Sequence, residues 1–347
     1  MNNSKFLKAL SLQSNSTPPV WFMRQAGRYL PEYQEIRKHY SNFLDMCKQP
    51  KTCAELALQP IDRFNLDASI LFSDILTIPD ALNLGLAFHE GEGPKFSNPI
   101  SSPQDIKKLI RFDVNAVDYV FKAVEETKKQ LPKDIPLIGF CGSPWTLAAY
   151  AIEGGGSKYF QKTKSFMKEH PDELQEFLEI LSNACYEYLR QQVLSGVNAL
   201  QIFDSWADLL SDKDLEDFSL RYTRLLTNQL KADPVTSNIP IILFEKAPKK
   251  KITDLIFKDI SCISLHWQED IKSVAEDLKN KYAVQGNLNP DVLLGPDELI
   301  WNETQKICTV MNEYPGFIYN LGHGITPDIK PQKVKVMIDA IREQFQN

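Results

Sequence analysis

Short apolar runs of strand length recur along the chain, and longer segments with helical periodicity separate them. This alternation is typical of a parallel sheet whose strands are joined by helices. Eight such runs occur, and eight parallel strands favour a closed (β/α)8 barrel of the TIM type in the α/β class. The alternative is an open, doubly wound sheet, but no Gly-x-Gly-x-x-Gly sequence follows the first run, so its nucleotide-binding version has no support. The predicted strands are Val20–Met23, Ala68–Phe72, Leu137–Phe140, Ala199–Phe203, Ile241–Phe244, Cys262–Leu265, Ala283–Gln285 and Phe317–Asn320.

Two of the intervening segments show the helical pattern clearly. Apolar residues recur at threes and fours across 117–131 and again across 174–189, as expected for helices that pack on a sheet. No internal repeat, low-complexity tract or long linker interrupts the series. The 347 residues fit one barrel, so we expect a single domain over 1–347, with 1–18 as a poorly ordered or helical N-terminal extension.

Composition and charge exclude several classes of protein. No stretch approaches the roughly 18 consecutive apolar residues of a membrane helix, and the first residues show neither a signal nor a transit peptide, which predicts a soluble, cytosolic protein. A net charge of −6 argues against nucleic acid binding, and an anionic ligand would have to be attracted by a few local arginines. Six scattered cysteines without a Cys-x-x-Cys pair indicate reduced thiols rather than disulfides or structural zinc.

Two arginines follow the first predicted strand, where the active site of such a barrel is built. Arg24 and Arg28 are separated by a stretch that contains Gly27, which lets the backbone turn sharply. A guanidinium binds a carboxylate in a bidentate manner and stays charged, so the pair suits a substrate with several acid groups. The alternative is that the two arginines form surface ion pairs with Glu32 or Glu35.

Asp74 follows the second predicted strand and precedes another apolar run, so we expect it to face the mouth of the barrel. A carboxylate accepts hydrogen bonds and donates none. Placed beside two arginines, it implies a ligand that also carries hydrogen-bond donors or develops positive charge. The alternative role for Asp74 is to cap a helix.

Other polar side chains follow the remaining strands. Ser143 and Pro144 begin a helix after the third strand, and this helix carries Tyr150 before three glycines, 154–156, end it. Ser205 follows the fourth strand without an acid–base partner in sequence, which favours hydrogen bonding over a nucleophilic role. His323 lies between two glycines after the last strand, where a ligand can approach closely. The same position after a strand is held by Asp204, Lys246 and His266.

These elements together resemble the uroporphyrinogen decarboxylase family of haem biosynthesis, and the resemblance covers essentially the whole chain. Three places depart from the family pattern: Glu-Lys-Ala-Pro at 245–248 replaces a usual Lys-Gly pair, His266 replaces an Asp before Trp, and Asn289 replaces an Asp before Pro290. The motifs that carry the resemblance are Arg24-Gln-Ala-Gly-Arg28-Tyr-Leu-Pro-Glu-Tyr33, Phe72-Ser-Asp74-Ile-Leu, Gly139-Phe-Cys-Gly-Ser-Pro-Trp-Thr-Leu, Tyr150 before Ile152-Glu-Gly-Gly-Gly-Ser157, Phe203-Asp-Ser205-Trp, Gln285-Gly-Asn-Leu288 and Asn320-Leu-Gly-His-Gly324.

The resemblance implies a β/α barrel that forms a homodimer with facing clefts. It implies the activity of a carboxy-lyase, which converts uroporphyrinogen III to coproporphyrinogen III stepwise by loss of CO2 from four acetate side chains, without cofactor or metal. It also implies the residues of the site. The catalytic ones would be Asp74, Arg24 and Arg28, and the substrate-binding set would be Arg24, Gln25, Ala26, Gly27, Arg28, Asp74, Tyr150, Ser205 and His323.

Pyrrole chemistry explains why such a reaction can proceed without a cofactor. Loss of CO2 from an acetate needs an electron sink, which most decarboxylases take from a cofactor or a metal. A pyrrole protonated on a ring carbon accepts the electrons of the C–CO2 bond, and a second protonation gives the methyl group. Asp74 would accept hydrogen bonds from the pyrrole N–H groups and stabilise the developing cation. The identity of each proton donor stays open.

Three other functions remain as alternatives. Related barrels bind zinc through a His-x-Cys pair and a distant cysteine, but the residue two positions after His323 is Ile325. Lys246 at a strand end could form a Schiff base with a carbonyl substrate. A tetrapyrrole carrier without activity is the third.

Overall fold

The sheet of the protein is parallel and curls around a packed interior. The computed structural model describes residues 4–89, 93–246, 258–278 and 281–345. Seven strands are hydrogen-bonded in the order β1-β4-β5-β6-β7-β8-β9, and every neighbouring pair is parallel. Their bounds are β1 Ser69–Ile70, β4 Leu137–Gly142, β5 Ala199–Asp204, β6 Ile241–Glu245, β7 Cys262–Ser264, β8 Ala283–Leu288 and β9 Phe317–Leu321.

The segment predicted as the first strand closes the ring between β9 and β1. Val20 forms a parallel bridge with Tyr319 of β9, and the Tyr319 amide donates to the Pro19 carbonyl at 2.9 Å. On its other side, the Asp67 amide donates to the Val20 carbonyl at 2.9 Å, just before β1 begins. The predicted barrel class is confirmed. The strand predicted over 20–23 is shorter than expected, since only Val20 makes a bridge to a neighbouring strand.

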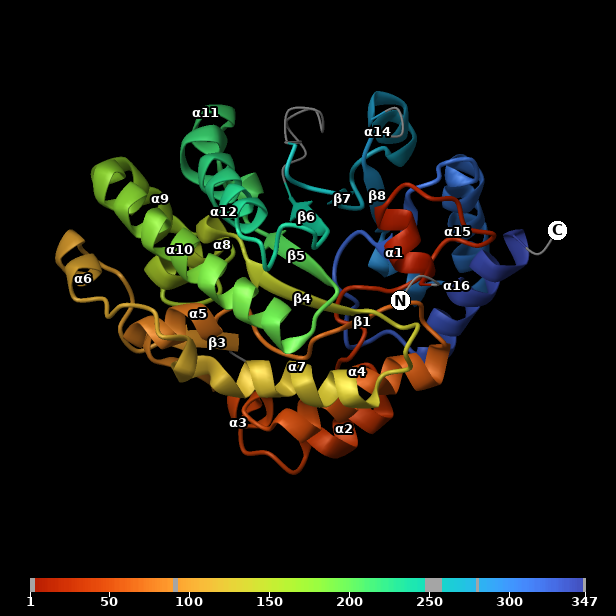
Figure 1. Ribbon diagram of the computed structural model, residues 1–347, viewed down its shortest axis with the longest axis horizontal. Coiled ribbons are helices and arrows are strands. Elements are labelled where there is room, and N and C mark those ends of the chain that lie inside the picture. Colours follow the sequence, from red (N-terminus) through yellow and green to blue (C-terminus); the bar gives the residue numbers. More distant parts are fainter. Residues whose placement is uncertain (1–3, 90–92, 247–257, 279–280, 346–347) are drawn as a thin grey trace.

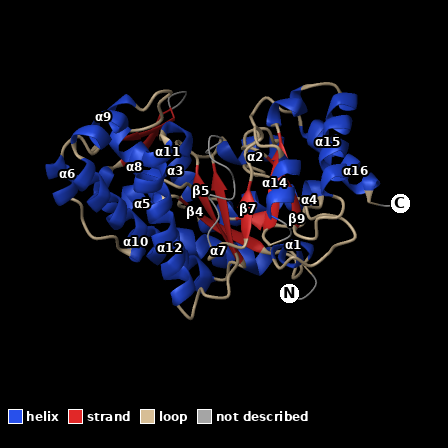
Figure 2. Cartoon of the chain, turned by 90° about the horizontal axis from the view of Figure 1, so that it is seen from above, coloured by secondary structure: helices blue, strands red, loops and turns tan. Residues whose placement is uncertain are grey.

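Helices surround the strands, which lie at the centre of the molecule in Figure 2. The helices that return the chain to the next strand are α4 (Pro50–Phe64), α7 (Asp118–Gln130), α10 (Pro171–Ser195), α12 (Arg221–Ala232), α14 (Ile271–Leu278) and α15 (Asp297–Met311), and α16 (Pro331–Gln344) follows β9 (Figure 1). Between β6 and β7, residues 247–257 lie outside the described part. Shorter elements are α1 (Lys5–Leu10), α2 (Pro31–Arg37), α3 (Phe43–Cys47), α5 (Thr77–Pro79), η1 (Asp80–Leu84), α6 (Pro103–Lys107), η2 (Val114–Val117), α8 (Pro144–Glu153), α9 (Gln161–Glu169), η3 (Ala207–Leu209), α11 (Asp212–Asp214), η4 (Leu215–Leu220) and η5 (Pro290–Leu294).

Helix α10 shows how the sequence specifies these outer elements. Pro171 lies in its first turn, where a missing N–H costs nothing, and Asp172 and Glu173 there complement the helix dipole. Apolar residues at threes and fours along 174–189 are buried against the sheet. Gly196, with φ 118°, ends the helix in a conformation that glycine adopts without strain. The helices predicted over 117–131 and 174–189 are therefore confirmed.

A smaller core fills the inside of the barrel, and α1 covers the end where the strands begin. Phe6 and Leu10 of α1 pack in one cluster with inward-facing strand residues such as Ile138 and Ile242. Leu12, just after α1, lies beside Gly316 and Ala283, at the starts of β9 and β8. The interior is thus a packed core rather than a channel. The opposite end, which we call the mouth, is where the strands end.

The structure contains one hairpin that the sequence pattern did not predict. Strands β2 (Leu86–His89) and β3 (Gly93–Phe96) pair in antiparallel fashion outside the barrel. Gly155, after α8, forms a bridge with Lys95 of this hairpin. A Cβ at Gly155 would lie 2.4 Å from the Pro94 carbonyl oxygen. The middle one of the three glycines therefore allows two backbones to approach closely.

The cysteines and the helices bear on two further predictions. All six cysteines are buried and unpaired, as expected for reduced thiols. In the described part of the chain, no helix combines the length and the apolar composition needed to cross a membrane.

Candidate active site

The barrel gathers the predicted polar residues at its mouth because all its strands run in the same direction. Each candidate follows a strand by a few residues, so the parallel register brings them to one end of the sheet. The helix predicted after the third strand is confirmed as α8, with Ser143 accepting from the Thr146 amide at 3.0 Å as its N-cap. The candidates at this end are Arg24, Arg28, Asp74, Tyr150, Ser205, Lys246, His266 and His323.

Arg24 lies in a turn that the surrounding structure holds in an unfavourable conformation. Its φ is 63°, in the left-handed region that costs a residue with a Cβ about 1 kcal/mol or more. The buried Gln25 side chain fixes this turn, since Oε1 accepts from the Phe22 amide (3.3 Å) and Nε2 donates to the Ala68 carbonyl (3.2 Å). On the other side, Asn320 Oδ1 accepts from the Met23 amide at 3.2 Å. Gln25 therefore has a structural task in this turn in addition to any role in ligand binding.

The loop after β9 leaves room for the Arg24 side chain. A Cβ at Gly324 would lie 2.6 Å from Cδ and 2.8 Å from Nε of Arg24. The Ile325 amide donates to the Met23 carbonyl at 3.1 Å and keeps the two loops together. The glycine that follows His323 thus lets the arginine side chain lie flat against the backbone.

Neither Arg24 nor Arg28 forms an ion pair with any residue that the structure describes. The two glutamates that offered an alternative are paired elsewhere: Glu32 Oε1 binds Arg63 Nε at 2.6 Å, and Glu35 Oε1 binds Lys38 Nζ at 2.6 Å. Both guanidinium groups are exposed, and so both are available to an acidic ligand.

Arg28 lies further toward α2 than Arg24 does. Burial raises the pKa of Tyr33 to about 12, and the charge of Arg28 is one of those that oppose this rise. No described contact joins Arg28 to Asp74 or to Tyr150. The structure thus relates Arg24 to these two residues more closely than it relates Arg28.

One oxygen of Asp74 stabilises the local turn, and the other is left for a ligand. Oδ1 accepts from the Leu76 amide at 2.8 Å, two residues further along the chain. The N-cap of α5 is Leu76 rather than Asp74, so the capping alternative is wrong. Oδ2 makes no hydrogen bond with a described residue. Burial raises the pKa of Asp74, while the Leu76 amide and the Arg24 charge oppose the rise. Asp74 and Arg24 are therefore close enough to act on the same ligand.

Tyr150 on α8 belongs to the same electrostatic environment. Burial raises its pKa, the negative charge of Asp74 adds to the rise, and the charge of Arg24 opposes it. Its ring contacts Trp206 edge-on, with 5.9 Å between centroids. Three strand ends thus converge on one region, through Arg24, Asp74 and Tyr150.

Two histidines lie beside each other at the mouth, one after β7 and one after β9. The rings of His266 and His323 are perpendicular, with centroids 6.2 Å apart. Burial, His323 and Lys246 lower the pKa of His266 to about 4. Burial and the charge of Arg24 lower the pKa of His323. Both imidazoles are consequently neutral at pH 7, and a carboxylate ligand beside His323 would favour its protonation.

Lys246 is held in an ion pair, which argues against a Schiff-base role. Its Nζ lies 2.8 Å from Asp208 Oδ2 and 5.6 Å from the centroid of the Trp206 ring. An ammonium group held in this way is a poor nucleophile, since a Schiff-base lysine must be neutral to attack.

Three residues at the mouth were given no role by the sequence patterns. Asp204 was noted only as following a strand, and Trp206 and Asp208 were not singled out as candidates. Their contacts reach residues far away in sequence, such as Thr146 and Lys246. The only available signal was their position after β5.

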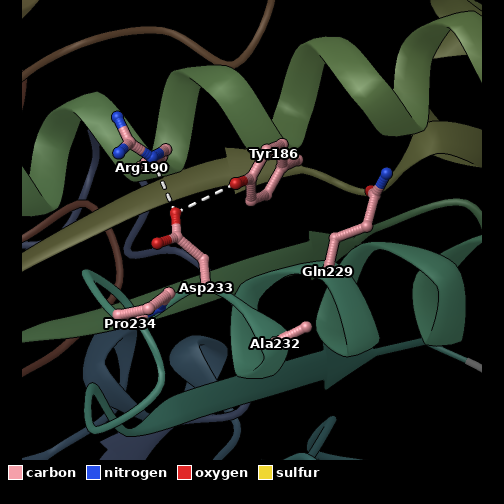
Figure 3. Close-up of a pocket in the computed structure, with 6 residues that line it drawn as sticks. All are labelled: Tyr186, Arg190, Gln229, Ala232, Asp233 and Pro234. Atoms are coloured by element: carbon pink, nitrogen blue, oxygen red, sulfur yellow. Dashed lines mark hydrogen bonds and ion pairs between the residues drawn. The ribbon is translucent and has the colours of Figure 1, made fainter.

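Two recesses in the surface lie away from the mouth. One, with a volume of about 420 Å³, is between α10 and α12, where Asp233 accepts from Arg190 (2.6 Å) and Tyr186 (2.9 Å) (Figure 3). The other, about 240 Å³, is near the start of β1 and includes Lys5, Asp67 and Arg342. Their polar groups bind one another, so neither offers the unpaired charges found at the mouth.

No cluster of three His, Cys, Asp or Glu side chains suited to a metal ion occurs within the described ranges. Cys262, in the strand predicted over Cys262–Leu265, is buried in the barrel interior, and burial raises the pKa of its thiol.

Comparisons with known proteins point to one family. A family model described as uroporphyrinogen decarboxylase (URO-D) matches residues 1–344. The uroporphyrinogen decarboxylase of Vesicomyosocius okutanii is 46% identical over 336 residues, which cover 97% of this chain and 96% of that protein. The one from Legionella pneumophila strain Philadelphia 1 is 42% identical over 344 residues, with coverage of 99% and 97%.

Solved structures share the fold at low sequence identity. A methyltransferase from Methanosarcina mazei is 20% identical, with a TM-score of 0.77 and coverage of 98% of this chain and 97% of that one. A B12-independent methionine synthase from Shewanella is 13% identical, with a TM-score of 0.55 and coverage of 96% of both chains. At these identities the likeness concerns the fold alone.

Proposed function

The chain belongs to the uroporphyrinogen decarboxylase family, and we propose that it decarboxylates uroporphyrinogen at the mouth of the barrel, with Asp74 and Arg24 at the reacting pyrrole. The activity is that of a carboxy-lyase. The curated uroporphyrinogen decarboxylases match this chain over nearly their full length. We infer further that all four acetate side chains of uroporphyrinogen III are converted to methyl groups, which gives coproporphyrinogen III and CO2.

The observation that carries this proposal is the arrangement of Asp74. Its Oδ2 has no partner among the described residues, and its Oδ1 is fixed by the Leu76 amide. A positioned carboxylate oxygen can accept hydrogen bonds from pyrrole N–H groups. When the ring carbon next to the one that bears the acetate is protonated, the same carboxylate stabilises the pyrrolium cation, which is electrostatic stabilisation of the transition state.

The chemical step replaces CO2 by a proton on each acetate arm. Protonation of the α carbon, next to the ring carbon that bears the acetate, leaves a conjugated iminium that is the electron sink. The C–CO2 bond then breaks as its electron pair enters the ring. A second proton adds to the exocyclic carbon to give the methyl group, and the ring carbon then loses the proton it gained. The pyrrole itself is the electron sink, so the proposed reaction uses no cofactor and no metal.

The remaining residues of the site hold the acid arms of the substrate. Arg24 and Arg28 are exposed cations without an ion pair in the described structure, and they suit the propionate and acetate carboxylates. Tyr150 and Ser205 offer hydroxyl groups, and His323 offers an imidazole that a carboxylate would help to protonate. The main chain of Gln25, Ala26 and Gly27 completes the loop between the two arginines.

We also propose that the protein is a single-domain, cytoplasmic homodimer over residues 1–347. The single domain is supported by the family model, which matches residues 1–344. Light scattering of the purified protein tests the dimer, since a mass near twice the 39.6 kDa of the chain is expected.

The decisive experiment is incubation of the purified protein with uroporphyrinogen, without oxygen and with a strong chelator. We expect the number of carboxyl groups in the product to fall from eight to four, as measured by mass spectrometry. An unchanged substrate would contradict the proposed function, and turnover that needs an added metal would contradict the cofactor-independent mechanism.

A further inference from the structure

The carboxylate of Asp204 is buried at the mouth without a cation. Asp204 is the last residue of β5 and has no exposed surface. Its Oδ1 accepts from the Thr146 hydroxyl at 2.8 Å, and its Oδ2 accepts from the Ser219 hydroxyl. No ion pair to Asp204 occurs among the described residues. Ser143 and the Trp206 amide are further hydrogen-bond donors to this carboxylate. Burying a carboxylate is costly, so a group kept in this place by neutral donors without a cation calls for an explanation.

Thr146 connects this carboxylate to the loop that follows β5. Its Oγ1 donates to Asp204 and also accepts from the Ser205 amide at 3.0 Å. A hydroxyl has a single proton, so the donation to Asp204 leaves its lone pairs to the Ser205 amide. The Asp204 carboxylate therefore fixes both the rotamer of Thr146 and the direction in which Ser205 leaves the strand.

The same contacts fix α8, which carries Tyr150. Trp145, in the first turn of α8, donates from its indole nitrogen to the Trp206 carbonyl at 2.9 Å. The Trp206 ring in turn contacts the Tyr150 ring. Ser205 and Tyr150, two proposed substrate contacts, are thus held relative to each other through the pair Asp204 and Thr146.

We propose that Asp204 is a positioning residue for the decarboxylation, which acts through the Thr146 hydroxyl to hold Ser205 and Tyr150 in register with Asp74. The inference rests on the proposed function, because it assigns these groups to the same substrate. Asp204 touches no substrate itself.

Because the reaction is stepwise, a loss of this positioning can be detected in the products. Each of the four acetate arms must in turn be placed against Asp74, and a misplacement of about 1 Å can cost roughly 100-fold in rate. When a loosened loop slows each step, partly decarboxylated intermediates leave the site more often before the next step. A change that only lowers the amount of folded enzyme slows all turnover but keeps the ratio of intermediates to final product.

The test compares three threonine variants under the same anaerobic conditions as the wild type. Thr146→Val removes the hydroxyl at nearly constant volume, and Thr146→Ser keeps it. Thr163→Val is the matched control, because Thr163 is equally buried and donates to the Ala149 carbonyl (3.1 Å) without contacting the loop after β5. The readouts are kcat, KM, the melting temperature and the carboxyl count of the products.

We expect Thr146→Val to lower kcat/KM about tenfold or more and to accumulate products with five to seven carboxyl groups. Thr146→Ser should recover most of the wild-type rate and product pattern. Thr163→Val should lower the melting temperature and leave the product pattern unchanged. Ser219→Ala, which removes another of the donors to Asp204, should shift the products in the same direction by a smaller amount, and it replaces Thr146→Val if that variant does not fold.

Two outcomes would overturn the inference, and they differ in what else they affect. If the wild type is active and the valine and alanine variants keep its product pattern, Asp204 has no positioning role while the proposed function stands. If the wild type does not decarboxylate uroporphyrinogen, the proposed function fails and this inference fails with it.

Discussion

The two ends of the barrel differ in how their charged side chains are paired. Where the strands begin, Asp67 accepts from the Val20 amide at 2.9 Å and lies 3.9 Å from Lys5, and Arg342 donates to the carbonyls of Phe64 and Asn65. At the mouth, Arg24 and Arg28 lack ion pairs among the described residues. One oxygen of Asp74 also lacks a hydrogen-bond partner there.

This difference separates stability from function within one fold. Paired polar groups and the apolar plug of α1 stabilise the closed end. At the mouth, one Asp74 oxygen and the guanidinium groups of Arg24 and Arg28 have no partner among the described residues, so they are available to a ligand with complementary charges. Each change described below should therefore affect either turnover or stability.

The largest expected effect is that of Asp74→Asn at the mouth. Asparagine keeps the size and an acceptor for the Leu76 amide, but it removes the negative charge that faces the pyrrolium cation. We expect kcat to fall by about 100- to 1,000-fold, with little change in the melting temperature. Turnover near the wild-type rate would remove Asp74 from the mechanism.

A substitution in the core at the closed end should lower the stability of the protein and leave its turnover unchanged. Leu10 of α1 is buried in the barrel interior, so Leu10→Ala should lower the free energy of unfolding by about 2 to 5 kcal/mol. Leu7→Ala, on a half-buried position of the same helix, should cost less. Urea unfolding measures both. Turnover per folded molecule should stay at the wild-type value, and a loss of kcat in Leu10→Ala would show that the two ends are coupled.

The sequence predicted the parts of this arrangement that follow from local patterns. Apolar runs identified the barrel strands, and position after a strand identified Arg24, Asp74 and His323 as residues of the mouth. Contacts between distant segments were not predictable in this way. Thr146 and Asp204 are 58 residues apart, and no periodicity relates them. The hairpin of β2 and β3 was also missed, because its strands have four residues each and β3 contains a proline, which weakens any strand signal.

A smaller effect on turnover is expected from Gly324→Ala. The new Cβ would lie 2.6 Å from Cδ of Arg24 and would displace a side chain that already has a strained backbone. We expect kcat/KM to fall about tenfold, mainly through KM, because the guanidinium binds a substrate carboxylate. Gly156→Ala is the control, since a Cβ there has no atom within 4 Å. Equal kinetics of the two variants would mean that the position of Arg24 is not critical.

The smallest expected effect concerns stability in acid and the buried imidazole of His266. The pKa of His266 is lowered to about 4 in the folded protein, and the groups that face it are His323, Lys246 and Asp208. Between about pH 6.5 and 4 the unfolded chain therefore binds more protons at this residue than the folded one, and the free energy of unfolding falls as the pH falls. One such group contributes a slope of at most about 1.4 kcal/mol per pH unit.

His266→Gln should flatten the fall measured by urea unfolding at several pH values, while His39→Gln, at an exposed position, should not. The same slope in both variants would mean that the acid sensitivity of the protein arises outside the mouth.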